Sequence, residues 1–201
     1  MKLRKFKSQR LTLYELMFFI PYDLFIVSCL LSTSFYRIYI EDFTKAVIVF
    51  CCGLLVLREL LLRKISRKTI LGLVAILLLF GLSFMGSRNA QNIVPAMFLF
   101  IYSARNIEFR KIAKNTLTIS MIVLIFVILS AKLGIIQEYH ATQWQNGRAR
   151  ERNYLGFLYA LYPSTIVFNI TCLIVYLKKD KLKPLYIILL FLVNFWFFKQ
   201  T

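Results

Sequence analysis

Three arginines at alternate positions, Arg148, Arg150 and Arg152, are the residues of this sequence best suited to binding an anion. Each guanidinium offers a planar fork of donors that matches phosphate or diphosphate oxygens, and it stays charged when partly desolvated. An extended segment would place all three on one side, whereas a helix would fan them out. The pattern indicates an anionic ligand; alternatively, the arginines are solvated or pair with Glu138 and Glu151.

A histidine and a turn signal accompany the arginines in the polar segment 137–152. His140 is the only histidine, and an imidazole can accept a proton from a sugar hydroxyl near neutral pH, so we predict a general base; the alternative is a merely exposed side chain. Asn146-Gly147 predicts a turn. Asn153 is predicted to cap a following helix, which would put Arg152 at a helix N-terminus, where an anion is favoured.

The elements that must position these residues are apolar. Hydrophobic residues make up 59% of the 201 and occur in long runs separated by short basic clusters, a pattern typical of membrane-spanning helices and their loops. We predict an all-α, polytopic integral membrane protein forming one domain, residues 1–201, with about seven transmembrane helices. The predicted spans are residues 13–35, 43–62, 70–86, 92–104, 117–136, 153–177 and 185–198.

The basic residues predict which side of the membrane each loop occupies, because cytoplasmic loops retain Lys and Arg. With seven crossings and a cytoplasmic N-terminus, eighteen of the 26 Lys and Arg lie on the inner side and eight on the outer side. If the short segment 92–104 did not cross, the division would be fifteen to eleven. We therefore predict a multi-pass protein of the cytoplasmic membrane in which residues 137–152 form an outer loop.

The charge and the cysteines exclude two other kinds of partner. The net charge of +17 suits a nucleic-acid-binding protein, but the basic residues lie between apolar runs and form no continuous face, so we expect no nucleic acid. The four cysteines all lie in apolar runs, and no Asp, Glu or His cluster on the outer side has the spacing of metal ligands. We expect no metal and no cofactor.

Charged residues also occur inside or at the ends of the predicted spans. Carboxylates in lipid are costly and commonly functional, so we predict that Asp23 is an intramembrane polar group that pairs with a functional arginine or, alternatively, with a structural partner. Glu15 is closer to the inner interface and is expected to reach Arg10. Arg58 and Glu59 end the second apolar segment and are predicted to anchor it at the inner interface.

The stretch Arg152-Asn-Tyr-Leu155-Gly156-Phe157, which leads from the polar loop into an apolar segment with Pro163, resembles the Arg-x-x-Leu-Gly-Phe signature of the Wzy-type polysaccharide polymerases, relatives of the O-antigen ligases. The short fourth segment, ending in Ala104-Arg105-Asn-Ile-Glu-Phe109 before a basic loop, is similar to the N-terminal half of capsular and exopolysaccharide polymerases. The chain departs from them at Leu158-Tyr-Ala-Leu-Tyr-Pro163, where many relatives have His-Pro-Asn. The relatives also have more spans, so we expect a chain truncated at its C-terminus.

The resemblance implies a function on the outer face of the cytoplasmic membrane. The protein would polymerise oligosaccharide repeat units, carried on a lipid diphosphate of the undecaprenyl type, into capsular polysaccharide, exopolysaccharide or O-antigen. Arg152, with Arg148 and Arg150, would hold the diphosphate or offset the charge on the departing lipid diphosphate, and His140 would deprotonate the acceptor hydroxyl. The implied partners are the lipid-linked oligosaccharide, the bilayer and other polysaccharide export proteins. An inactive truncated remnant and a small membrane transporter subunit are the alternatives.

Overall fold

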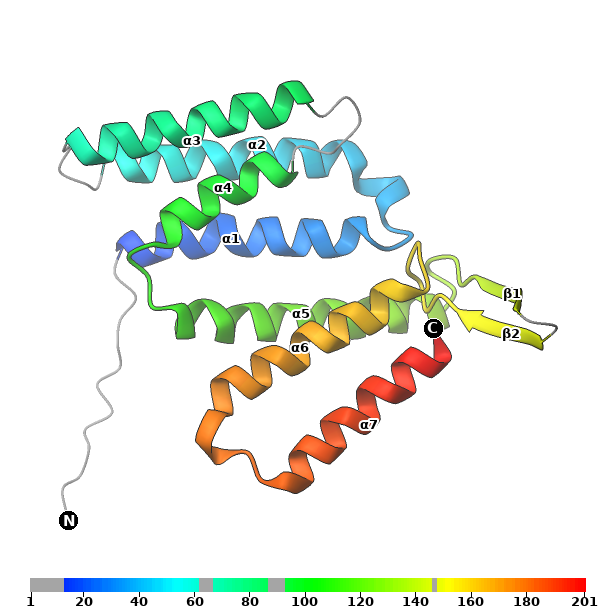
Figure 1. The fold of residues 1–201 in the computed structure, drawn as a ribbon. Coiled ribbons are helices and arrows are strands. Elements are labelled where there is room, and N and C mark those ends of the chain that lie inside the picture. The colour runs from blue at the N-terminus through cyan, green and yellow to red at the C-terminus, as the bar shows by residue number, and fades with distance from the viewer. Residues whose placement is uncertain (1–12, 62–66, 87–92, 146–147) are drawn as a thin grey trace, which may run out of the picture. The chain divides into compact units, whose positions relative to one another are not determined.

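The computed structural model describes residues 13–61, 67–86, 93–145 and 148–201 (Figure 1). About 80% of the structure is helical, which confirms the all-α class. The helices among the described residues are α1 (Leu13–Ser32), α2 (Arg37–Leu61), α3 (Arg67–Gly86), α4 (Ile93–Ala104), α5 (Phe109–Lys132), α6 (Leu161–Lys178), the short 3-10 helix η1 (Lys179–Lys181) and α7 (Pro184–Gln200). A β-hairpin, β1 (His140–Gln145) and β2 (Arg148–Asn153), lies between α5 and α6.

Within the described ranges, three helices, α1, α5 and α6, are long and apolar enough to cross a membrane. Helix α7 is also apolar but shorter, with 17 residues and no buried residue. Large hydrophobic side chains are exposed on all seven α-helices of the described chain, as expected where lipid rather than water surrounds them. These features indicate a membrane protein.

Two helices begin eight residues away from their predicted starts: α5 begins at Phe109 rather than at residue 117, and α6 begins at Leu161 rather than at residue 153. We predicted a helix from residue 153, capped by Asn153, but α6 begins at Leu161 and its N-cap residue, Ala160, makes no side-chain cap hydrogen bond. Leu155 and Gly156 have φ angles of 50° and 82°, which a right-handed helix cannot contain. The predicted cap is therefore wrong: Asn153 ends β2 instead, and Arg152 lies in a strand rather than at a helix N-terminus.

The chain divides into two compact units. Unit 1 comprises residues 1–22 and 49–107, and unit 2 comprises residues 23–48 and 108–201. In unit 1, α3 packs against α4, and the described buried side chains include Phe18, Leu55 and Phe100. The rings of Phe18 and Phe100 meet edge to face, with their centroids 6.4 Å apart.

In unit 2, α6 packs against both α5 and α7, and β2 contacts α7 (Figure 1). The buried core is made mainly of branched aliphatic side chains from α5 and α6, joined by Phe157 from the segment after the hairpin; it comprises Val123, Leu124, Val127, Ala131, Ile136, Phe157, Ile166, Val167 and Ile170. Phe157 is fully buried. The segment that follows the arginines therefore belongs to the core.

Backbone hydrogen bonds join this segment to the turn between α1 and α2. The N–H of Phe35 donates to the carbonyl of Gly156 at 3.1 Å, and the N–H of Leu158 donates to the carbonyl of Thr33 at 2.9 Å. Ser34 and Phe157 form an isolated antiparallel bridge between the two segments. These bonds provide partners for backbone groups that lie outside the helices. They also hold the base of the hairpin in place within unit 2.

Replacing Gly156 should separate steric packing from backbone strain. A Cβ at Gly156 would lie 2.8 Å from the Cβ of Ala131 and 3.0 Å from Cδ1 of Ile136, whereas Gly134, also at positive φ, has nothing within 4 Å. We predict that Gly156→Ala lowers the free energy of unfolding in detergent by about 2 to 4 kcal/mol and Gly134→Ala by only about 1 kcal/mol, since the second change adds strain without a clash. Equal losses would show that the segment after the hairpin is not tightly packed.

Candidate functional site

The three predicted anion-binding arginines lie on one strand of the hairpin. Strand β2 pairs antiparallel with β1 in a register that joins Arg152 to Ala141, Arg150 to Gln143 and Arg148 to Gln145. The predicted turn residues, Asn146-Gly147, lie outside the described residues. The extended conformation that convergence of the arginines requires is therefore the one observed.

The register separates the charges of the hairpin between its two faces. Side chains alternate along a strand, and directly paired residues share a face, so the arginine positions 148, 150 and 152 lie together with positions 141, 143 and 145. Within the two described strands, no Asp or Glu occupies that face. Alternate residues of a strand are about 7 Å apart, so the three arginine positions follow one another along this face of the hairpin.

Arg152 is the arginine of this group whose side-chain surroundings are described. It is half-buried, and its Nε atom is buried with no hydrogen-bond partner among the described residues. A buried donor without a partner costs about 1 to 3 kcal/mol, more when the group is charged. An anion that accepted from this edge of the guanidinium would remove that cost.

His140 lies on the opposite face of the hairpin, together with Glu151 and Asn153. Its Nδ1 is 2.5 Å from Oδ1 of Asn153, whose amide nitrogen donates to Oε1 of Gln200 at 3.3 Å. With the amide oriented in this way, its oxygen can only accept, so Nδ1 is the donor in this contact. The structure does not bring His140 onto the face that carries the arginines.

The carboxylates considered as partners for the arginines also lie elsewhere. Glu151 lies on the face opposite the arginines, and Oε1 of Glu138 is 3.8 Å from Nε2 of His140. Asp23 in α1 accepts a hydrogen bond from the amide of Asn115 in α5. Asp23 therefore has a structural partner, the alternative to a functional arginine. The expected contact of Glu15 with Arg10 lies outside the described residues.

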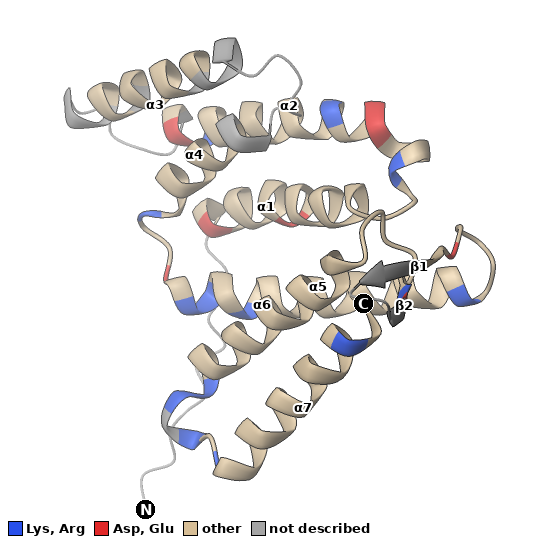
Figure 2. Cartoon of the chain, turned by 45° about the vertical axis from the view of Figure 1, so that its right-hand side comes forward, with Lys and Arg blue, Asp and Glu red and all other residues tan. Residues whose placement is uncertain are grey.

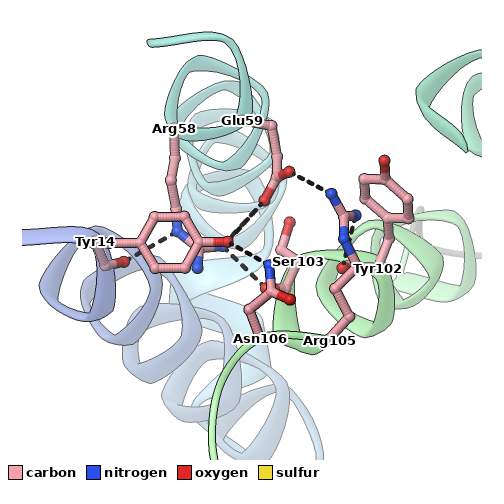
Figure 3. Close-up of polar contacts among 7 residues, drawn as sticks. All are labelled: Tyr14, Arg58, Glu59, Tyr102, Ser103, Arg105 and Asn106. Carbon is pink, nitrogen blue, oxygen red and sulfur yellow. Dashed lines mark hydrogen bonds and ion pairs between the residues drawn. The ribbon is translucent and has the colours of Figure 1, made fainter. Parts of the chain in front are cut away.

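Unit 1 contains a buried ionic network that was not predicted from the sequence (Figure 3). Arg58 and Glu59 were predicted to be interfacial anchors, but their side chains are fully buried. The guanidinium of Arg58 donates from Nε to the carbonyl of Tyr14 and from an Nη to the carbonyl of Ser103, both at 3.0 Å. Its Cζ also lies 3.6 Å from the centroid of the Tyr14 ring. Arg58 thus joins α2 to α1 and α4 in place of contacting a headgroup.

Glu59 completes this network by binding two arginines. One carboxylate oxygen lies 3.4 Å from Arg58, and the other is 2.8 Å from the guanidinium of Arg105, which stacks 3.5 Å from the centroid of the Tyr102 ring. The Tyr14 hydroxyl donates to Glu59 at 3.5 Å and accepts from Asn106 at 3.3 Å. The one available sequence signal was an Arg-Glu pair at the end of an apolar segment, which fits either an anchor or a buried pair.

No protein-family model, curated protein or solved structure matches this chain. The resemblance to the polysaccharide polymerases therefore stays a prediction carried by residues 152–157. In the described part of the chain, no group of three or more His, Cys, Asp and Glu residues is placed to hold a metal ion. The hairpin offers arginines for anion binding on one face and carries His140 on the other.

We predict that Glu59→Ala lowers the free energy of unfolding by about 3 to 5 kcal/mol, because it leaves the buried Arg58 and the partly exposed Arg105 without their shared carboxylate. Unfolding in detergent, monitored by circular dichroism, measures the loss. Glu41→Ala is the matched control, since Glu41 forms an exposed ion pair with Lys45 at 3.6 Å and its removal should change stability little. Equal effects of the two changes would show that the network in unit 1 does not hold its helices together.

Proposed function

We propose that this protein binds the diphosphate of a lipid-linked oligosaccharide on the arginine face of its hairpin and polymerises the repeat units at the outer surface of the cytoplasmic membrane. The observation that carries the proposal is the register of β1 and β2, which aligns positions 148, 150 and 152 on one face. Diphosphate is the ligand class that three arginines at alternate positions of one strand suit best. The polymerase activity rests on the resemblance of residues 152–157 to the polymerase signature.

The proposed topology has seven crossings and a cytoplasmic N-terminus. Helices α1, α5 and α6 support it by their length and hydropathy, and the bias of basic residues towards one set of loops supports the orientation. The hairpin follows the C-terminal end of α5 and precedes α6, so it lies at a membrane surface when both helices cross. A lipid-linked substrate presents its diphosphate at that depth.

The proposed reaction transfers a growing glycan. The acceptor hydroxyl oxygen forms a bond to the anomeric carbon of the donor, and the bond from that carbon to the diphosphate oxygen breaks with its electron pair on the leaving lipid diphosphate. The arginines stabilise the charge that develops on this leaving group. The hydroxyl proton passes to a base. Because His140 lies on the other face of the hairpin, diphosphate binding by the arginines and proton transfer to His140 are two separable proposals.

The sidedness of the hairpin is tested by labelling. We predict that Asn146→Cys, in a chain whose four native cysteines are replaced by alanine, reacts with a membrane-impermeant maleimide in intact cells. A cysteine at Lys181, in the connection between α6 and α7, should react only after lysis, because that connection is proposed to lie on the cytoplasmic side. The reverse pattern would place the arginines in the cytoplasm and remove the proposed substrate from their reach.

Arg152→Lys tests the arginine face. Lysine keeps the charge but loses the planar fork, so we predict about tenfold weaker binding of undecaprenyl diphosphate in nanodiscs and shorter polymer in a complementation assay, with expression retained. Arg37→Lys is the matched control, since it changes an arginine at the start of α2, outside the hairpin. His140→Gln should leave diphosphate binding intact and reduce polymer only if His140 is the base. Unchanged binding and polymer in Arg152→Lys would exclude Arg152 from the site.

A further inference from the structure

A second basic region lies in unit 2 where α5 begins and α6 ends. Two adjoining cavities, of about 480 and about 430 Å³, share Arg110, Leu177 and Lys178 in their linings. We call them together the α5–α6 groove. Figure 2 shows the basic residues at the start of α5 and those of the α6–α7 connection towards the same end of this unit.

The lining of the groove is strongly cationic. Its basic residues come from two separate stretches of chain and comprise Arg110, Lys114, Lys178, Lys179 and Lys181. Among the described residues that line either cavity, none is acidic. A bias of basic residues towards the inner loops accounts for lysines in a connection, but it does not require that they meet an arginine of another helix around a cavity. The convergence is the feature that indicates a ligand, and the ligand is an anion.

The depth of the groove identifies the source of that anion. Both α5 and α6 have the length and hydropathy of membrane spans, and the groove lies at one end of each, where a bilayer places its headgroups. Phe109 and Tyr176 meet edge to face beside it, with ring centroids 5.1 Å apart, and Nζ of Lys178 lies 5.2 Å from the centroid of the Tyr186 ring. Aromatic rings of this kind are enriched at the membrane interface.

Lys179 has a backbone conformation that lysine rarely adopts. It follows α6 with φ 36° and ψ −107°, in the region that favours glycine. A glycine there would relieve strain, whereas the lysine adds a charge to the groove. Replacing Lys179 by glycine therefore removes one positive charge from the groove and should raise the folding stability rather than lower it.

We propose that the α5–α6 groove binds the phosphate of an anionic lipid headgroup, with Arg110 as a forked donor and the lysines of the α6–α7 connection as point charges. The ligand chemistry is a phosphate diester, and its source is the lipid leaflet at this end of α5 and α6. This site lies at the end of these helices away from the hairpin, so it does not depend on the proposed polymerase activity.

The test compares lipid binding by matched charge variants of the full chain. Native mass spectrometry after titration with phosphatidylglycerol in detergent should show about tenfold weaker lipid binding for Arg110→Gln/Lys178→Gln, because both residues line both cavities. Lys132→Gln/Lys199→Gln removes the same charge at the C-terminal ends of α5 and α7 and should bind the lipid like the wild type. Lys179→Gly should weaken phosphatidylglycerol binding while the thermal unfolding temperature stays the same or rises.

Three outcomes would overturn the proposal. Equal losses in both double variants would show that only the overall charge attracts the lipid. Unchanged binding in Lys179→Gly, whose fold is not at risk, would remove the α6–α7 connection from the site. Saturable binding of glycerol phosphate with the same affinity as phosphatidylglycerol would assign the groove to a soluble phosphate instead of a lipid.

Discussion

A chain that lies in lipid must form hydrogen bonds within itself for all its backbone polar groups. In this chain the rest of the structure depends most on such bonds at one non-helical junction, between the hairpin and α6. Between the hairpin and α6 the backbone passes through two residues at positive φ, Leu155 and Gly156, and cannot continue a helical hydrogen-bond pattern. Its polar groups bond instead to Thr33 and Phe35 in the turn between α1 and α2. The position of the hairpin and the start of α6 both depend on this junction.

The same junction gives a physical meaning to the segment that resembles the polymerase signature. Gly156 is needed because a Cβ there would meet Ala131 and Ile136, and Phe157 fills the core between α5 and α6. Leu, Gly and Phe are thus packing residues in this chain, whereas the arginine of the signature lies on the hairpin that they hold. In this chain the segment thus combines packing residues with the arginine that we propose to bind the diphosphate.

Unit 1 meets the same constraint with side chains. The Arg58 guanidinium is fully buried, and it is tolerated because carbonyls of α1 and α4, a tyrosine ring and Glu59 surround it (Figure 3). Glu59 in turn is shared with Arg105, so one carboxylate balances two cations at the ends of three helices. The free-energy cost of desolvating such a pair offsets most of the attraction between its charges. Its main effect is therefore to select which helices pack together.

The sequence by itself determined the helical class and, to within eight residues at either end, the seven apolar helices of the described chain, because hydrophobic runs of this length have few other solutions in a bilayer. It also indicated Arg148, Arg150 and Arg152 as anion-binding candidates, and their alternate spacing predicted that an extended strand would place all three on one face. Only the tertiary structure decided that Asn153 ends a strand instead of capping α6, that His140 faces away from the arginines, and that Arg58 and Glu59 are buried. Each of these features depends on contacts between residues far apart in the chain, such as Thr33 with Leu158 or Tyr14 with Arg58. A local sequence pattern does not show which distant residues will be in contact.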